Sequence, residues 1–362
     1  MTTGVCYDER CLPHDNGSMI VNERVADWLD VPHAESAARL SRTWQVIERA
    51  GLLERVERIP APEATDDELL LVHTPEHLAL LREASRSESV VTIGPEARAG
   101  PGSWEAASIA VGGLLECVDL VMAGELANAY ALCRPPGHHA SADQAMGFCL
   151  FNSVAIAARH LGRRHGLERV AIVDWDVHHG NGTQDLFYDD GSVLFVSLHQ
   201  DGLYPADCGT LAERGSGAGE GATVNVPLPA GTGDDGYRLA FARVVEPVVR
   251  RFEPQFLLVS AGQDAAASDP LGRMSVTTEG FRALAESARA LADELCGGRV
   301  VAVHEGGYSV DHVPLCNLAI LEALAGLPPT WERDPIELDV PTTVGDRARE
   351  AIDAAARAAG VA

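Results

Sequence analysis

The strongest chemical signal in the sequence is the nonapeptide DWDVHHGNG, which begins at Asp174 directly after the apolar run Val170–Val173. In an extended chain alternate side chains point the same way, so Asp174, Asp176 and His178 share one face. A carboxylate and an imidazole on one face can bind a divalent cation, and a further carboxylate can orient them. A plain polar loop is disfavoured, because burying such groups unpaired is costly. The spacing predicts a metal site with Asp176 and His178 as ligands.

Two adjacent histidines, His138 and His139, follow a Pro-Pro-Gly turn in the stretch RPPGHH. The prolines stiffen this backbone, and imidazole titrates near neutral pH. Such a pair can take a proton from water and return one to a leaving group. By itself the pair is as often structural as catalytic, so its interpretation depends on the other motifs.

Asp264 ends the stretch SAGQD, which again follows an apolar run directly. An aspartate in this place is usually a turn or helix-capping residue. As a third ligand it would leave a divalent zinc ion nearly neutral, with open positions for water and substrate. This assignment depends on the other loops converging with it.

Tyr308 ends the stretch EGGY, in which two glycines permit a tight turn. A tyrosine hydroxyl held over a pocket can donate a hydrogen bond to a developing oxyanion. Alone, this tetrapeptide is more often an ordinary turn.

The elements that must position these residues alternate between short apolar runs and helix-like segments. Four runs predict strands that are buried on both faces of a parallel sheet: Arg169–Val173, Val193–Leu198, Phe256–Ser260 and Arg299–Val303. Six segments predict helices: Ala34–Ala50, Pro75–Ser85, Ser153–His165, Tyr237–Phe252, Thr278–Leu295 and Gly345–Ala359. The sequence therefore predicts an α/β fold with a central, mostly parallel sheet and helices on both faces. Ligands bind at the carboxyl ends of the strands in such sheets, so the four motifs should converge on one site.

The composition fits a cytoplasmic protein without a nucleic-acid or membrane partner. The chain has 362 residues and a net charge of -25, which repels phosphate backbones. No apolar run approaches the roughly 20 residues of a membrane span, and Met1–Asp8 lacks the features of a secretory leader. The 8 cysteines form no C-x-x-C pair, which favours reduced thiols. We expect a single domain over residues 1–362, with a catalytic core of about 5–327 and a C-terminal helical extension of about 328–362.

Together the four motifs resemble those of the histone deacetylase superfamily, whose bacterial members include acetylpolyamine amidohydrolases and histone deacetylase-like amidohydrolases. RPPGHH, DWDVHHGNGTQ, SAGQDA…DPL and EGGY follow the family's order between about Tyr7 and Leu327. Asn181 and the DPL sequence at Asp269 resemble class II members, and Ala145–Ser153 resembles the bacterial amidohydrolases. The resemblance implies the arginase/deacetylase-like fold and a zinc-dependent hydrolase of acylated amines.

Position by position, the resemblance implies roles for residues of this chain. Three match the zinc ligands: Asp176, His178 and Asp264. Four match the catalytic groups: His138, His139, Asp174 and Tyr308. Four match the walls of the acyl-amine channel: Gly147, Phe148, Tyr204 and Leu271. Five match the surroundings of a structural potassium ion, through side chains or backbone carbonyls: Asp174, Asp176, His178, Ser197 and Leu198.

In the implied mechanism, zinc binds water and polarises the amide carbonyl. His139, with His138 beside it, deprotonates the water and later protonates the departing amine. Tyr308 and zinc stabilise the oxyanion. Relatives with histidine in place of Tyr308 are poor hydrolases, so the tyrosine implies an active enzyme.

Three positions depart from the resemblance. Gln263 replaces the Phe of many class II members, which affects packing beside an intact Asp264. His304 precedes EGGY where an apolar residue is usual. We interpret it as a buried, hydrogen-bonded histidine, with a role in tuning pKa values of the site as the alternative. His33-Ala34-Glu35 replaces the common HPE in a segment that shapes the rim.

Leu271 bears on the substrate, because polyamine-selective relatives carry an acidic residue there. Leu271 argues against that recognition mode, although Asp15, Glu23 or Asp207 could supply a rim carboxylate. The substrate stays open between acyl-lysine peptides and small acetylated amines, with a dedicated acetylpolyamine or specialised-metabolite deacetylase as the alternative. An inactive acyl-lysine-binding module is disfavoured by the complete catalytic set, and a phosphoesterase by the missing basic residues. The resemblance further implies a homo-oligomer, either a dimer or a tetramer.

Overall fold

An eight-stranded parallel sheet runs through the middle of the molecule, in the order β2-β1-β5-β10-β9-β6-β7-β8. The computed structural model describes all residues except 1, 20–27 and 29–30. The strands are β1 (Thr2–Cys6), β2 (Glu57–Ile59), β5 (Leu126–Ala131), β6 (Val170–Asp174), β7 (Val193–Gln200), β8 (Thr223–Leu228), β9 (Phe256–Ala261) and β10 (Val300–His304). Every residue of β6, β7, β9 and β10 is buried, as expected for apolar strands covered on both faces.

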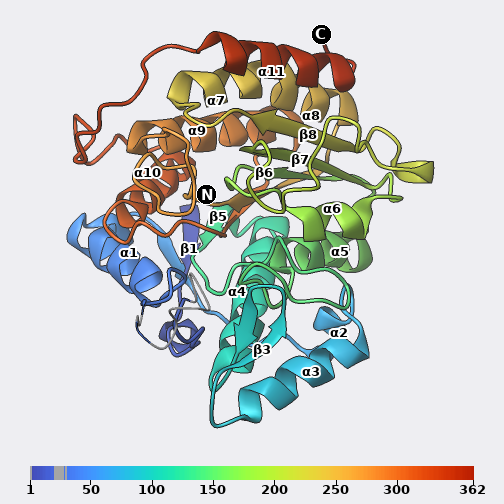
Figure 1. Cartoon of the computed structure of the whole chain (residues 1–362), viewed down its shortest axis with the longest axis vertical. Coiled ribbons are helices and arrows are strands. Elements are labelled where there is room, and N and C mark those ends of the chain that lie inside the picture. The colour runs from blue at the N-terminus through green and yellow to red at the C-terminus, as the bar shows by residue number, and fades with distance from the viewer. Residues whose placement is uncertain (1, 20–27, 29–30) are drawn as a thin grey trace.

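Helices cover both faces of this sheet (Figure 1). On one side lie α4 (Ser103–Met122), α5 (Ser153–His165) and α6 (Asn181–Phe187). On the other lie α1 (Ala38–Arg49), α7 (Asp234–Ala240), α8 (Glu246–Phe252), α9 (Thr278–Leu295), α10 (Val313–Ala325) and α11 (Asp346–Ala358). Beside α4, α2 (Asp66–Leu69), α3 (Pro75–Arg86) and the antiparallel hairpin β3 (Val91–Gly94) and β4 (Ala97–Ala99) form a smaller lobe.

The predicted α/β fold is confirmed. The four predicted strands are observed with ends shifted by one or two residues, and the helices Ser153–His165 and Thr278–Leu295 have the predicted bounds. The helix expected at Tyr237–Phe252 begins earlier, at Asp234, and contains a π-helical turn at Phe241–Val245.

Several elements escaped the sequence analysis, among them β1, β2, β5 and β8, which complete the sheet. Before residue 97 the sequence predicts two helices, Ala34–Ala50 and Pro75–Ser85, and no strand, yet β1 and β2 lie there as well. The sequence of β5, LANAYA, is rich in alanine and asparagine, which have low strand propensity. Pairing with β1 and β10 on its two sides therefore decides its conformation.

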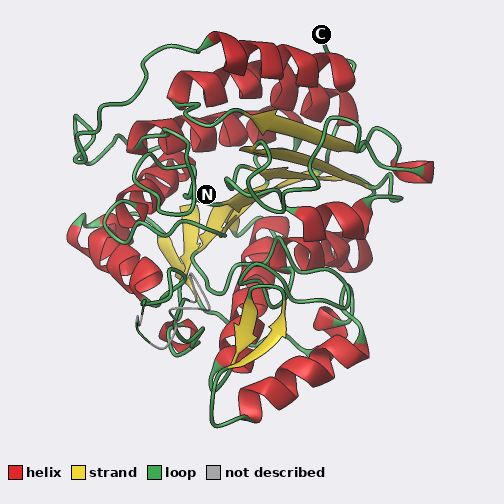
Figure 2. Cartoon of the chain, in the orientation of Figure 1, coloured by secondary structure: helices red, strands yellow, loops and turns green. Residues whose placement is uncertain are grey.

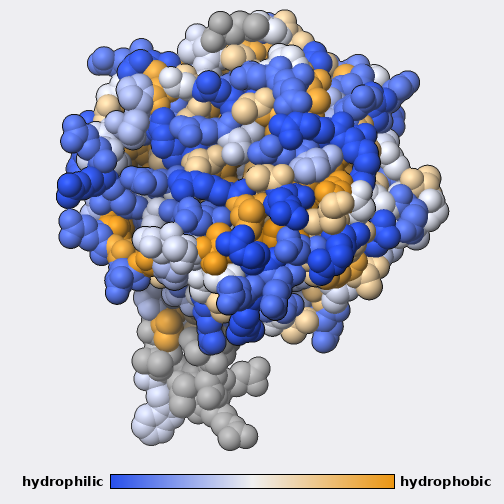
Figure 3. All heavy atoms as spheres, turned by 90° about the horizontal axis from the view of Figure 1, so that it is seen from above, coloured by the Kyte–Doolittle hydropathy of each residue, from blue (hydrophilic) through white to orange (hydrophobic). Residues whose placement is uncertain are grey.

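The C-terminal segment leaves α10 through a long loop and returns as α11, which packs against β8 (Figure 2). Its buried face consists of small and branched apolar residues, with Ile352 fully covered. The face seen in Figure 3, over which α11 runs, is predominantly hydrophilic with apolar residues in small groups. None of the helices described by the structure is long and apolar enough to cross a membrane. All eight cysteines are free thiols, and seven of them are buried.

Candidate active site

The four chemical motifs follow four adjacent strands of the sheet, β5, β10, β9 and β6. Because these strands are parallel, their carboxyl ends lie at one edge, where the loops meet. Asp174 is the last residue of β6 and His304 the last of β10, so each motif begins where a buried strand stops. The convergence expected from the sequence is therefore present.

Asp176, His178 and Asp264 bring three metal-ligating atoms together at this edge. His178 Nδ1 lies 3.1 Å from Asp176 Oδ1 and 3.1 Å from Asp264 Oδ2. Tetrahedral ligands held at about 2.1 Å from zinc stand about 3.4 Å apart, so this spacing fits a zinc ion. Burial alone would lower the pKa of His178, but the carboxylates of Asp264 and Asp176 raise it well above its ordinary value. The triad thus favours positive charge, as a metal site requires.

Backbone amides hold both carboxylates of this triad in place. Gly306 N–H donates to Asp176 Oδ2 at 2.8 Å, and Val177 N–H donates to Asp264 Oδ1 at 2.8 Å. A Cβ at Gly306 would lie 2.0 Å from Asp264 Oδ2, and one at Gly262 would lie 2.1 Å from Asp176 Oδ2. Only glycine fits at these positions, which gives a steric reason for glycines in both SAGQD and EGGY.

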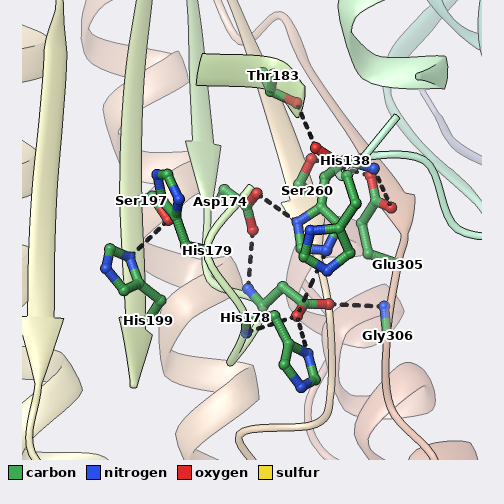
Figure 4. A network of polar contacts seen from close by, with 12 residues as sticks. His138, Asp174, His178, His179, Thr183, Ser197, His199, Ser260, Glu305 and Gly306 are labelled. Carbon is green, nitrogen blue, oxygen red and sulfur yellow. Dashed lines mark hydrogen bonds and ion pairs between the residues drawn. The ribbon is translucent and has the colours of Figure 1, made fainter. Parts of the chain in front are cut away.

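His138 and His139 are held by different partners, and Figure 4 shows the contact of His138 with Asp174. His138 Nδ1 donates to Asp174 Oδ2 at 2.9 Å, and His139 Nδ1 donates to Asn181 Oδ1 at 2.8 Å. Although burial opposes it, the carboxylates of Asp176 and Asp174 raise the pKa of His138 to about 10. Burial and the neighbouring His138 hold the pKa of His139 well below its ordinary value. His139 is therefore the neutral member of the pair, with Nε2 as a proton acceptor.

Two further carboxylates fix the catalytic loops, and a role for neither was predicted from the sequence. Glu305 Oε2 accepts from the N–H groups of Gly137 at 2.6 Å and His138 at 3.2 Å, and Glu305 Oε1 accepts from Ser260 (Figure 4). Asp269 Oδ2 accepts from Tyr308 N–H at 2.6 Å. Both signals stood in the motifs themselves, as the glutamate of EGGY and the aspartate of DPL.

A cavity of about 420 Å³ leads to the triad. The four residues expected to form the channel all line it: Gly147, Phe148, Tyr204 and Leu271. His139, His178 and Tyr308 lie at its inner end, and the remaining lining residues are Ser18, Met19, His33, Glu96, Arg98 and Leu203. Phe148 meets the Tyr308 ring edge-on with centroids 5.7 Å apart, and Tyr204 meets His139 in the same way at 5.0 Å. Aromatic rings thus line the cavity beside His178, one of the candidate metal ligands.

Among the lining residues that the structure describes, Glu96 is the acidic one, and it was not predicted from the sequence. Glu96 lies at the tip of the β3–β4 hairpin, where its carbonyl oxygen accepts from Phe148 N–H at 3.0 Å. Asp15 and Asp207 are not among the described lining residues, and Glu23 lies outside the part of the chain that the structure describes.

The two unusual residues beside the site are both buried. Gln263 donates from Nε2 to the hydroxyl of Tyr130 at 3.1 Å. His304 Nδ1 donates to the carbonyl of Cys133 at 3.0 Å, and burial with the charge of Arg39 lowers the pKa of His304 to about 3. This contact agrees with the interpretation of His304 as a buried, hydrogen-bonded histidine.

The two residues expected near a potassium ion outside the DWDVH motif, Ser197 and Leu198, lie on β7. Asp174 and Ser197 are register partners on neighbouring strands, and both are fully buried. The Ser197 hydroxyl is 3.0 Å from His199 Nδ1 (Figure 4). The structure thus brings the two expected potassium side chains together.

Comparison with known proteins identifies the family. A family model described as histone deacetylase domain matches residues 33–324. The chain belongs to the histone deacetylase family. This histone deacetylase family member is 43% identical over 346 residues to a histone deacetylase-like amidohydrolase of Pseudomonas aeruginosa. The match covers 94% of this chain and 91% of that relative.

Two other matches agree with this assignment. A probable deacetylase of Archaeoglobus fulgidus is 39% identical over 338 residues, with 92% of this chain and 89% of the relative covered. The crystal structure of the HDA15 HD domain superposes on this chain with a TM-score of 0.85 at 35% sequence identity. The superposition covers 98% of this chain and 95% of the HDA15 chain. Membership therefore places the chain among the deacetylases and amidohydrolases, a class of amide hydrolases, and confirms the expected resemblance.

Proposed function

We propose that this histone deacetylase family member is a zinc-dependent hydrolase of acylated amines, such as acyl-lysine side chains or small acetylated amines. The observation that carries the proposal is that His178, which lies with Asp176 and Asp264 in one cluster of metal-ligating atoms, lines the aromatic cavity. A cavity of this kind suits a side chain that presents its amide to the metal ligands. When bound there, zinc would act as a Lewis acid toward an amide carbonyl and lower the pKa of water.

The protein's own groups supply the proton transfers in this proposal. His139, neutral and anchored by Asn181, can accept a proton from water through Nε2 and pass it to the departing amine. His138, oriented by Asp174, places positive charge beside the site where the oxyanion develops. Tyr308 lines the same cavity as His139, and its hydroxyl can donate to the same oxyanion.

The experiment that tests the enzyme proposal is the Tyr308→Phe substitution. Loss of one oxyanion donor should lower kcat roughly 100- to 1,000-fold. Bound zinc should be unchanged, because the hydroxyl is not a ligand. Tyr188→Phe, at the end of α6, serves as the matched control and should keep full activity. A Tyr308→Phe protein with wild-type amide hydrolysis would refute the oxyanion role.

Substrate choice requires a panel of acetyl-lysine peptide, acetylspermidine, acetylputrescine and a trifluoroacetyl-lysine amide. Leu271 in the wall favours apolar contacts, which supports acyl-lysine peptides over polyamines. Glu96 keeps the dedicated polyamine deacetylase as the second candidate, since its carboxylate could pair with a distal ammonium. The second candidate would be favoured if the wild type turned over acetylspermidine faster than the acetyl-lysine peptide, and if Glu96→Gln lowered the turnover of acetylspermidine.

The proposal also includes a structural potassium ion, a homo-oligomer and a location in the cytoplasm. The proximity of Asp174 and Ser197 supports the potassium ion, with backbone carbonyls near Asp176, His178 and Leu198 as further ligands. Thermal unfolding in potassium, compared with sodium, at constant ionic strength tests this ion. Light scattering of the purified chain tests the dimer or tetramer.

A further inference from the structure

A second group of metal-ligating side chains lies between α4 and α5, away from the catalytic motifs. His160 Nε2 is 2.8 Å from Asp119 Oδ1, and His165 Nε2 is 2.6 Å from the same oxygen. The ligand atoms of all three residues lie within 4.8 Å of one another. Two imidazole nitrogens and one carboxylate oxygen thus point at a single place on the protein surface.

This group lies at the opposite end of the sheet from the catalytic loops. Asp119 is in the last turn of α4, which ends just before β5 begins, and His165 is the last residue of α5, just before β6. The group is therefore near the amino ends of these strands, whereas the catalytic motifs follow their carboxyl ends. The carboxyl ends of both helices meet here, and their partial negative charge favours a cation.

We propose that Asp119, His160 and His165 form a second metal site, for a divalent transition ion such as Zn²⁺, Co²⁺ or Ni²⁺. Two imidazoles and one carboxylate are a ligand set that these ions accept, with water completing the coordination. His160 is 4% exposed, whereas Asp119 and His165 are 22% and 20% exposed. One ligand is thus fixed in the interior while the others stay open to an incoming ion and its water.

Only small movements separate the present contacts from metal coordination. Ligands around a tetrahedral zinc ion stand about 3.4 Å apart, so both nitrogen atoms must retreat from Asp119 Oδ1 by less than about 1 Å. His165 ends its helix and is partly exposed, so its side chain can make this shift. Partial burial of Asp119 opposes ionisation, but hydrogen bonds from His160 and His165 keep its pKa below the ordinary value. The carboxylate is therefore ready to bind.

Arg164 is the competing cation of this cluster. Its Nη1 lies 3.3 Å from Asp119 Oδ2, whereas both histidines contact Asp119 Oδ1. The Arg164 side chain is 61% exposed and can leave without uncovering an apolar surface. The alternative explanation is a hydrogen-bonded clamp between two helices that binds no metal.

The test counts metal ions on the full chain without an affinity tag. The chelator-treated protein is dialysed against buffered Co²⁺, and bound metal is measured by mass spectrometry. We expect two ions per wild-type chain and one ion in either Asp264→Asn or His165→Ala. Loss of a direct ligand should weaken the α4–α5 site by more than the roughly 10- to 100-fold seen when an outer partner is lost.

Two further variants separate a metal site from a clamp. Arg164→Ala should bind the second ion about two- to fivefold more tightly, because a competing surface ion pair is gone. Arg163→Ala, an exposed residue on the same turn without contact to Asp119, should change nothing. Acetyl-lysine hydrolysis by His165→Ala should equal that of the wild type. Equal metal content in the wild type and His165→Ala would overturn the proposal, whether or not the catalytic triad binds a metal.

Discussion

Glu35 should be the side chain whose loss most damages both stability and catalysis outside the metal triad. Its carboxylate accepts from Arg134 Nε at 2.7 Å, from Arg134 Nη2 at 2.6 Å and from Arg39 Nη1 at 3.0 Å. All three side chains are at most 1% exposed. Glu35→Gln therefore leaves two guanidinium groups buried with no anion between them. Breaking a buried pair in this way costs about 3–5 kcal/mol, out of a total stability of about 5–15 kcal/mol.

Urea unfolding followed by circular dichroism measures this loss. Glu286→Gln is the matched control, because Glu286 is 53% exposed and pairs with Arg282 one helical turn away, and such pairs contribute less than about 1 kcal/mol. If Glu35→Gln costs no more than the control at an unchanged m-value, the role of the buried network is wrong. The arginines pull the pKa of Glu35 far below 4.5, although burial opposes them. The contribution of Glu35 to the free energy of unfolding is therefore complete above that pH and is lost on acidification. The stability of Glu35→Gln should not show this decrease at low pH.

Catalysis should fall in the same variant, because the network supports both catalytic loops. Arg134 begins the RPPGHH loop, and Arg39 donates to the carbonyls of Gly307 and Glu305 in the EGGY loop. The Arg39 guanidinium also lies 4.9 Å from the centre of the Tyr308 ring. We expect kcat for acetyl-lysine hydrolysis to decrease at temperatures where the variant is still folded, with its active-site zinc retained.

Three other predictions concern single side chains. Asp174→Asn removes the anion that accepts from His138 Nδ1, so kcat should fall roughly 100- to 10,000-fold in steady-state assays while the triad keeps its zinc. Gly306→Ala places a Cβ against both ligand carboxylates and should lower zinc affinity at least about tenfold in competition with a chelator, whereas Gly162→Ala, whose Cβ would make an ordinary contact 3.6 Å from the carbonyl oxygen of Leu167, should not. Burial, with the neighbouring His77, lowers the pKa of His73 to about 3 from 6.5, so its contribution is complete above pH 6.5 and lost as the pH falls. The wild type should lose about 2 kcal/mol through this group between pH 6.5 and 5, and His73→Gln should lose less in urea unfolding at the two pH values. An equal decrease in the free energy of unfolding between these pH values in both proteins would contradict the role assigned to His73.

Two of the three expected metal ligands were predictable because their signals are local. Asp176 and His178 stand two residues apart after a buried strand, and strand periodicity alone places them on one face. Asp264 as a metal ligand and Tyr308 as an oxyanion donor became credible because the loops that follow parallel strands lie at one edge of the sheet. That rule belongs to the fold and cannot be read from the residues themselves. The central strands were apolar enough to be recognised without the structure.

The parts that escaped prediction depend on contacts between distant segments. Glu35 and Arg134 are 99 positions apart, and an ion pair leaves no periodic pattern in a sequence. Glu96 enters the cavity wall only because its hairpin docks on Gly147 and Phe148 through backbone hydrogen bonds. The Ala-rich β5 becomes a strand because two neighbours pair with it, which propensity cannot show.

The order of the site in the chain has a consequence for synthesis on the ribosome. A hydrogen bond between Arg39 and Gly307 spans 268 positions, and the EGGY loop that completes the site is among the last parts of the core to emerge. A chain that ends before this loop can have folded helices. It lacks Tyr308, and it lacks the Gly306 N–H group that donates to the carboxylate of Asp176. If Asp176, His178 and Asp264 bind a metal as proposed, their complete set therefore forms only after β9 has been made, and folding that depends on such distant pairings is slow. Binding of the metal would then be a late step in the maturation of the chain.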